Sequence, residues 1–116
     1  MSKNPKVFLE DILRCCEKIE KLCSGLTQEQ FELNEEKQAA VMYYLQIIGE
    51  ATKRLHSADP TVGERTPHIP WIDMAKTRDF LIHHYEEAKV SEIWQTIQND
   101  IPSLLSQIKS LLVKFQ

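Results

Sequence analysis

A single stretch, Arg78-Asp79-Phe80-Leu81-Ile82-His83-His84-Tyr85, gathers an arginine, imidazoles and a phenol. An imidazole can take the proton of an RNA 2′-hydroxyl, or protonate a leaving oxygen, near neutral pH. A guanidinium offers a planar fork to phosphate and favours the extra charge of a pentacoordinate transition state. An arginine, an imidazole and a phenol within eight residues therefore supply the groups that cleavage of RNA without a metal requires. Because the 2′-hydroxyl would be the nucleophile, the reaction would select RNA over DNA.

Helix geometry limits how these side chains can meet. Successive residues of an α-helix lie about 100° apart, so Arg78 and Tyr85 fall nearly on one face, whereas His83 lies about 140° from Arg78. A straight helix would not direct all three at one phosphate. Either the helix distorts near His83, or two subunits contribute to a shared cleft. The second alternative predicts a homodimer.

The same residues also allow a structural interpretation. An arginine, a histidine five positions on and a tyrosine two further occur together often by chance. A His-His-Tyr cluster at a helix end is commonly a cap or a partly buried polar group. On spacing alone this interpretation is the favoured one. His84 is expected to pack or to support rather than catalyse, and His56 and His68, which flank a loop, are expected to be exposed.

Apolar residues recur at helical spacing through the first half of the chain. Asn4-Pro5 predicts the start of a helix that Gly25 can end. The run Thr27-Gln28-Glu29-Gln30 is a capping-box pattern that opens a short helix. Asn34 begins a long helix whose wide apolar stripe, over residues 41–55, predicts more than one neighbour.

The second half is expected to hold the candidate site. Residues 57–69 contain two prolines and a glycine and are predicted as a loop. A helix follows from Pro70 over residues 71–85, and its pattern breaks around residues 86–89. A last helix starts near Ser91, and Pro102 should kink or divide it. With no strand alternation anywhere, the sequence predicts an all-α, four- to five-helix up-down bundle in a single domain, residues 1–116.

Composition narrows the class of protein further. The 116 residues are 42% hydrophobic and 27% charged, which is typical of a globular domain. No apolar run is long enough to span a membrane and no signal peptide is evident, so a cytoplasmic protein is expected. The net charge of −3 argues against a general nucleic-acid binder. All four histidines lie within residues 56–84, so any RNA contact should be local to the middle of the chain.

Three cysteines, Cys15, Cys16 and Cys23, fall in the first predicted helix. They form no CxxC pair, and no histidine stands at zinc-ligand spacing. We interpret them as small core residues in a reducing compartment rather than as a zinc site. The sequence thus predicts neither a metal nor a cofactor.

Several blocks of sequence together resemble the HepT family. They are residues 45–51 (LQIIGEA), 67–71 (PHIPW), 78–85 (RDFLIHHY), 90–94 (VSEIW) and 100–102 (DIP). Asp11-Ile12 and Phe31 extend the resemblance over nearly the whole chain. Each block is weak alone, but their shared order and spacing make the combination specific.

This resemblance implies a HEPN fold, a homodimer and the toxin of a type VII-like toxin–antitoxin pair. The toxin would cleave RNA through Arg78 and His83 of an RX4HXY motif, in which Tyr85 is the tyrosine. It also implies an antitoxin partner, a minimal nucleotidyltransferase (MNT), which in this family can transfer AMP units from ATP onto that tyrosine. Asp79, His84 and Glu50 are candidate supporting residues.

Two details of the motif depart from the commonest pattern of the family. Asp79 stands where many relatives carry Asn, and a carboxylate beside Arg78 could compete with phosphate. Residues 86–88 are Glu-Glu-Ala where a Phe-Gly-type turn is usual, which places acidic charge beside the expected cleft.

Other functions remain open from sequence. The chain could be a non-catalytic helical module that binds a nucleotidyltransferase and presents its substrate. It could also be an oligomerisation module with a structural His-Tyr cluster. Toxicity on expression without the neighbouring gene would separate the first hypothesis from these two.

Overall fold

The computed structural model describes residues 4–115, and every regular element within them is helical. The prediction of an all-α fold is therefore confirmed. In chain order the elements are α1 (Pro5–Cys23), α2 (Gln28–Glu32), α3 (Glu35–Ala58), α4 (Val62–Arg65), α5 (Trp71–His83), the 3-10 turn η1 (Tyr85–Glu87), α6 (Val90–Gln95), the π turn η2 (Thr96–Asp100) and α7 (Ile101–Val113).

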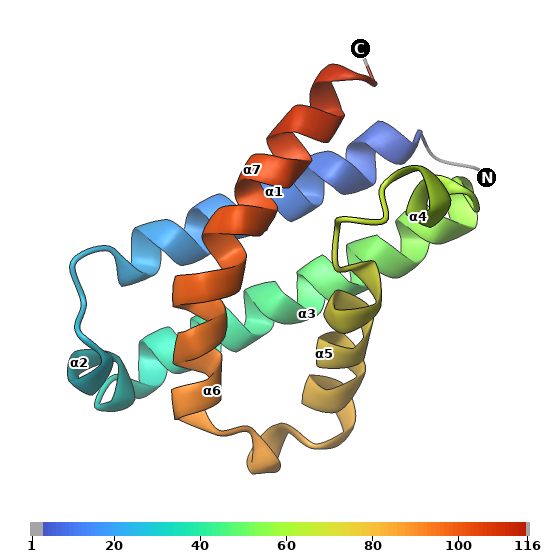
Figure 1. Cartoon of the computed structure of the whole chain (residues 1–116). Coiled ribbons are helices and arrows are strands. Elements are labelled where there is room, and N and C mark those ends of the chain that lie inside the picture. The colour runs from blue at the N-terminus through green and yellow to red at the C-terminus, as the bar shows by residue number, and fades with distance from the viewer. Residues whose placement is uncertain (1–3, 116) are drawn as a thin grey trace.

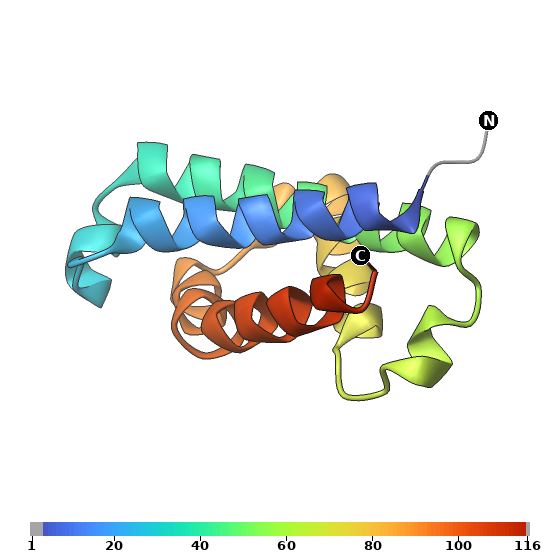
Figure 2. The same cartoon turned by 90° about the horizontal axis from the view of Figure 1, so that it is seen from above.

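The long helices form two layers. Helices α1 and α3 run antiparallel and side by side (Figure 1). Helix α5 and the continuous helical segment formed by α6, η2 and α7 cross them. Seen from above, α7 lies in a separate layer from the α1–α3 pair (Figure 2). One continuous core fills the space between the layers, and its fully buried side chains include Leu9, Ile12, Ile19, Phe31, Val41, Leu55, Leu81 and Ile108.

Local signals in the first half of the chain are confirmed. The Asn4 side chain accepts a hydrogen bond from the Lys6 amide at the start of α1. Gly25, two residues after the end of α1, adopts the left-handed φ of 78° that is typical after a helix C-terminus. Thr27 and Gln30 make both hydrogen bonds of the capping box. Asn34 caps α3 by accepting from the Lys37 amide. These contacts involve neighbours in sequence, which explains why the sequence predicts them.

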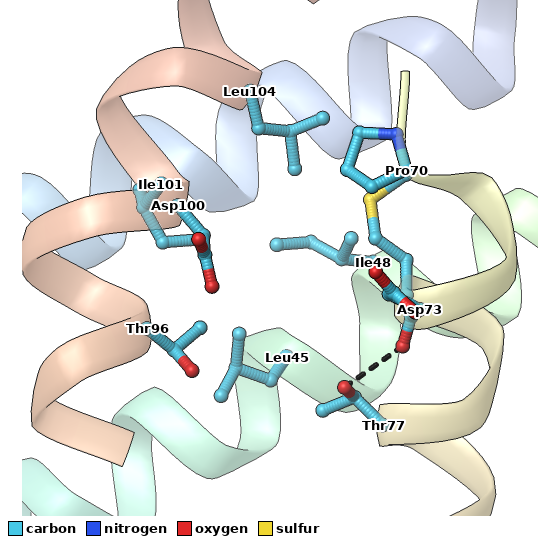
Figure 3. A pocket seen from close by; sticks show the side chains of 10 residues that line it. Leu45, Ile48, Pro70, Asp73, Thr77, Thr96, Asp100, Ile101 and Leu104 are labelled. Atoms are coloured by element: carbon cyan, nitrogen blue, oxygen red, sulfur yellow. Dashed lines mark hydrogen bonds between the residues drawn. The ribbon is translucent and has the colours of Figure 1, made fainter. Parts of the chain in front are cut away.

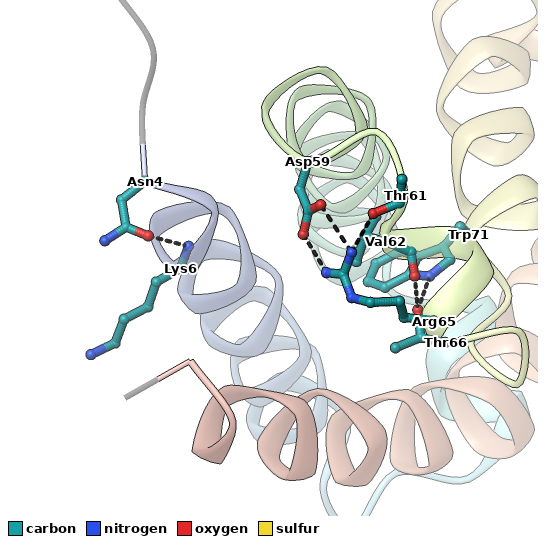
Figure 4. Close-up of polar contacts among 8 residues, drawn as sticks. All are labelled: Asn4, Lys6, Asp59, Thr61, Val62, Arg65, Thr66 and Trp71. Atoms are coloured by element: carbon teal, nitrogen blue, oxygen red, sulfur yellow. Dashed lines mark hydrogen bonds and ion pairs between the residues drawn. The ribbon is translucent and has the colours of Figure 1, made fainter.

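The predicted loop at residues 57–69 is partly wrong. Helix α3 continues to Ala58, and α4 makes a further helical turn around the buried Val62. The Arg65 guanidinium bonds to Asp59, while the Thr66 hydroxyl accepts from the Trp71 indole nitrogen at 2.9 Å (Figure 4). These contacts order the connection and fix where α5 begins.

Pro102 divides the last helix, as predicted. Since proline has no N–H, the carbonyl four residues before it loses its α-helical partner. The chain accommodates this with the π turn η2, in which the Ile101 amide bonds to the Thr96 carbonyl, and α7 then starts with Pro102 in its first turn. Helix α6 begins at Val90, close to the start predicted near Ser91.

The three cysteines of α1 are free and buried in the core. Burial raises the pKa of the Cys16 thiol to about 12 and that of Cys15 to about 11. Unreactive thiols packed against apolar neighbours fit the interpretation of these residues as core side chains.

Candidate functional site

Arg78 sits where α5 crosses closest to α3. The crossing is possible because position 49 is glycine. A Cβ added to Gly49 would lie 2.1 Å from the Cβ of Arg78 and 2.7 Å from the Met74 carbonyl oxygen, and real side chains do not approach so closely. The missing side chain of Gly49 therefore sets how near the backbone of Arg78 comes to α3.

Two carboxylates hold the Arg78 guanidinium. Its Nη2 lies 3.1 Å from Oε2 of Glu50, on α3, and its Nη1 lies 3.1 Å from Oδ1 of Asp79. Arg54, one turn further along α3, contacts the other oxygen of Glu50 at 3.2 Å. The Arg78 side chain is about a quarter exposed, so its charge is fixed in direction yet remains accessible. Of the candidate supporting residues, Glu50 and Asp79 are thus placed directly against Arg78.

Asp79 also binds a lysine that the sequence analysis did not identify. The Lys53 ammonium lies 2.5 Å from the same Asp79 oxygen that Arg78 contacts. The hydrogen bond from Lys53, followed by that from Arg78, lowers the pKa of Asp79 below its usual value. Asp79 is therefore ionised near neutral pH and sits between two cations.

His83 is the last residue of α5, and its side chain is exposed. The next residue, His84, leaves helical geometry with φ −135° and ψ 34°, and its amide still bonds to the Phe80 carbonyl at 2.7 Å. The His84 ring packs 5.6 Å from the ring of Phe80, and its Nδ1 lies 3.4 Å from Glu87. His84 thus contacts its local neighbours, as expected of a packing residue.

Tyr85 lies beyond the helix, in the 3-10 turn η1, with 44% of its surface exposed. The predicted helix through residue 85 is therefore two residues too long, and the argument that placed Tyr85 on the face of Arg78 does not hold. Glu86 and Glu87 are exposed in the same turn. The motif tyrosine and the acidic patch share one surface segment.

The structure does not bring Arg78 and His83 onto one face. Helix α5 is regular through His83, so the separation of about 140° expected from helix geometry remains. Arg78 points at α3, and His83 points largely away from it. The helix end does distort near His83, at His84, but this moves Tyr85 and leaves the separation of Arg78 and His83 unchanged. A cleft shared by two subunits is compatible with this geometry.

Of the other two histidines, one prediction is wrong. His68 is exposed as expected, but His56 is half-buried: its Nδ1 lies 2.9 Å from the Thr52 carbonyl oxygen, and its ring packs against Trp71 at 5.5 Å. It helps to join α3 to the start of α5.

Comparison with known proteins places the chain in a family. Residues 12–111 match the family model described as "Ribonuclease HepT-like". The chain belongs to the HepT-like ribonuclease family. A Thermococcus cleftensis protein named "Probable ribonuclease HepT" is 39% identical over 96% of this chain and 98% of its own length. Proteins named "Putative RNase" from Caldanaerobacter subterraneus (37% identical, 97% of each chain) and Methanocaldococcus jannaschii (33%, 95% of this chain and 88% of its own) are also similar.

These matches support an RNase-type function for this HepT-like chain. No solved structure matches it significantly. Within residues 4–115, no helix is long and apolar enough to cross a membrane. No group of three or more histidine, cysteine or acidic side chains in the same part of the chain is arranged to hold a metal ion.

A pocket of about 110 Å³ lies elsewhere on this HepT-like fold, between α3, α5 and α7 (Figure 3). Leu45 and Ile48 line its floor, and Asp73 and Asp100 stand on opposite walls. Thr77 lines it, but neither Arg78 nor His83 does. The candidate catalytic residues therefore lie outside this pocket, on the more open surface of α5.

Sequence reasoning missed Lys53 as a site residue. Its only sequence signal is that it follows Glu50 by three positions, which puts both on one face of α3. Its pairing with Asp79 joins residues 26 positions apart and depends on how α3 and α5 cross. A search for cations one turn from the LQIIGEA block would have found it.

Proposed function

We propose that this protein is a metal-independent endoribonuclease that cleaves RNA by attack of a 2′-hydroxyl. The observation that carries the proposal is α5 itself, which presents a fixed, accessible guanidinium at Arg78 and an exposed imidazole at His83. Both groups act on phosphodiesters without a metal. Membership of the HepT-like ribonuclease family supports the same substrate class.

In the proposed reaction, the His83 imidazole takes the proton of the 2′-hydroxyl, and the 2′-oxygen forms a new bond to phosphorus. The bond from phosphorus to the 5′-oxygen breaks, that oxygen takes a proton from water as it leaves, and the protonated His83 returns its proton to the solvent. Arg78 stabilises the extra negative charge on the phosphoryl oxygens. The products are a 2′,3′-cyclic phosphate and a 5′-hydroxyl.

A homodimer would bring an Arg78 and a His83 into one cleft. The apolar stripe at residues 41–55, which predicts more than one neighbour for its helix, is largely used within the subunit, since Val41, Leu45 and Ile48 pack in the core. A different surface supports the dimer: α5 exposes Ile72 (71%) near its start and Phe80 and Ile82 in its last turn, next to His83. Exposed apolar side chains along one helix are typical of a protein interface.

The dimer is tested by replacing Ile72 with aspartate. Wild-type protein should scatter light with twice the monomer mass at micromolar concentration, and Ile72→Asp should give a folded monomer without RNase activity. Leu33→Asp, at an exposed apolar residue far from α5, should stay dimeric and active. A wild-type monomer that cleaves RNA would contradict the shared cleft.

Catalysis is tested by Arg78→Ala and His83→Ala. Each change should lower cleavage at least 100-fold and leave the circular dichroism spectrum and melting temperature nearly unchanged. Chelators should leave the wild type active, and its products should carry 2′,3′-cyclic phosphate ends. Full activity in the double variant, or activity that depends on added metal, would refute this mechanism.

We further propose that the RNase is the toxin of a toxin–antitoxin pair and that an MNT partner silences it by attaching AMP to Tyr85. An exposed phenol in a surface turn is accessible to another enzyme. AMP would add negative charge and bulk two residues from His83, and both would oppose binding of an RNA phosphate to that histidine. Co-expression with the neighbouring nucleotidyltransferase should add AMP units of about 329 Da each to the Tyr85 peptide.

Measurements of cell growth and of protein mass together test the toxin role and the modification of Tyr85. Cells that express the protein alone should stop growing, and those that also express the partner should not. Tyr85→Phe should remain toxic beside the partner. If Tyr85 is unmodified in a neutralised protein, inhibition occurs by binding alone.

A second function is favoured by one observation. Arg78 is paired with two carboxylates and directed away from His83, an arrangement that also suits a structural role. In that case the chain would be a helical module that binds a nucleotidyltransferase and presents its substrate. Stable complex formation without toxicity or RNA cleavage would support this alternative.

A further inference from the structure

Cations from two helices converge on a single oxygen. Lys53 of α3 approaches Oδ1 of Asp79 to 2.5 Å, and Arg78 of α5 approaches the same oxygen to 3.1 Å. An anionic oxygen held by a lysine and an arginine is also the usual environment of a bound phosphate. The Asp79 carboxylate therefore occupies a position where a phosphate oxygen would be equally well placed.

The surrounding charges form one chain across α3 and α5. Arg54 contacts Glu50, Glu50 contacts Arg78, Arg78 contacts Asp79, and Asp79 contacts Lys53. These five side chains are three cations and two carboxylates, so together they carry one net positive charge. If Asp79 withdrew, Glu50 would still hold Nη2 of Arg78 and leave Nη1 and the Lys53 ammonium free to bind an anion.

We propose that Lys53 and Arg78 together bind a phosphodiester oxygen of the RNA, and that the Asp79 carboxylate fills this site until RNA displaces it. The inference rests on the proposed function, because it takes Arg78 as a phosphate-binding group. It adds a second phosphate-binding residue, Lys53, and an internal competitor, Asp79. The ligand is a phosphate of a single RNA strand, recognised by charge and independent of base sequence.

The site is accessible enough for this exchange. The side chains of Lys53 and Asp79 are 41% and 48% exposed, and an ion pair so close to water is held weakly. Arg78 is more enclosed, at 26%, and is held from the other side by Glu50. Exchange therefore requires only a rotation of the Asp79 side chain, while the guanidinium keeps its place.

The test measures RNA binding separately from cleavage. In a His83→Ala background, a fluorescently labelled single-stranded RNA is titrated at several salt concentrations. Lys53→Gln should weaken binding about 5- to 10-fold at low salt and reduce the slope of log affinity against log salt by about 0.7. Lys76→Gln, which removes an exposed lysine of α5, is the matched control and should change the affinity less than about 2-fold.

Removing the competitor should have the opposite effect. Asp79→Asn should tighten binding at least about 3-fold, since two cations are then free for phosphate. In this Asp79→Asn background, Lys53→Gln should still weaken binding. If it does not, Lys53 acts only by holding Asp79, and the proposal of a direct phosphate contact is refuted. Equal effects of Lys53→Gln and Lys76→Gln, or weaker binding by Asp79→Asn, would also refute it.

Failure of this inference can be distinguished from failure of the proposed function. If wild-type protein cleaves RNA but Lys53→Gln and Lys76→Gln bind RNA with equal affinity, the RNase function stands and the Lys53 site is refuted. Lys53-dependent binding by wild-type protein that produces no cyclic phosphate ends would keep the site and overturn catalysis.

Discussion

Helices α1 and α5 belong to the same bundle but use their residues differently. Helix α1 is capped by Asn4 and buries seven side chains in the core. Helix α5 has no side-chain cap, buries only Trp71 and Leu81, and leaves Ile72, Phe80 and Ile82 exposed. Its polar residue Arg78 is directed inward at α3. Helix α1 thus contributes mainly to the core, and the exposed groups of α5 fit the proposal that this helix faces a substrate or a second copy.

The largest expected effect is the difference in stability lost when an apolar side chain is shortened in α1 and in α5. Ile12→Ala in α1 removes a fully buried side chain and should lower the free energy of unfolding by about 2–5 kcal/mol. Ile82→Ala removes a side chain that is already half exposed and should cost less than about 1 kcal/mol. Urea denaturation measures both changes in the monomeric Ile72→Asp background, in which the proposed dimer contact of Ile82 is absent. Similar losses would show that α5 contributes to the core as much as α1.

A smaller effect is expected where α3 meets α5. Gly49→Ala forces a Cβ to within 2.1 Å of the Arg78 Cβ, so α5 must move, at a cost of about 1–3 kcal/mol. RNase activity should fall as well, because Arg78 moves with its helix. Gly63→Ala is the matched control: its Cβ would lie 3.4 Å from the His56 ring, which can shift, and stability should change little. A stable, fully active Gly49→Ala protein would contradict the close crossing.

A smaller difference in stability is expected between substitutions at the N-cap of α3 and at the N-cap of α6. Asn34→Ala removes the side chain that accepts from the Lys37 amide and should destabilise the protein by about 1 kcal/mol. Lys89 occupies the corresponding position before α6 without a side-chain cap, so Lys89→Ala should change stability by less than about 0.5 kcal/mol. Thermal melts of both variants measure the difference. An equal loss would mean that the segment before α6 is ordered by Lys89 in another way.

The last expected effect concerns alkaline pH. The Cys16 thiol has its pKa raised by burial from 9.0 to about 12 in the folded protein. A raised folded pKa stabilises the fold fully below pH 9, and this contribution is lost as the pH rises from 9 toward 12. The free energy of unfolding should therefore fall less between about pH 8 and 10 in Cys16→Ala than in wild type. An identical pH dependence would mean that this thiol ionises equally in both states.

The fold was predictable wherever neighbours in sequence decide it. Asn4, Gly25, the Thr27–Gln30 box and Asn34 mark helix ends through contacts within a few positions. Helix α4 was not predictable, because it depends on a hydrogen bond from the Trp71 indole to the Thr66 hydroxyl and on another from Arg65 to Asp59. The early end of α5 depends on His84 leaving helical geometry, for which the sequence holds no glycine or proline signal.

The candidate site divides in the same way. The residue types at Arg78, His83 and Tyr85 suit RNA cleavage, but their spacing alone favours a structural role, and only the resemblance to the HepT family changes that balance. The ion pairs of Arg78 with Glu50 and of Asp79 with Lys53 could not be derived, because they arise where two helices cross. The helix spacing correctly indicated that Arg78 and His83 diverge.

The π turn η2 acts as a change of register within one apolar line. A turn that holds an extra residue rotates everything after it by about 100° relative to an uninterrupted α-helix. The buried residues before the turn, in α6, pack toward α2, and those after it, in α7, pack along α1. Loss of one residue from Thr96–Asp100 would remove the π turn and turn Leu104 and Ile108 away from α1, while Pro102 would still leave one carbonyl without its α-helical donor. In evolutionary terms, this stretch should tolerate substitution far better than any change in its length.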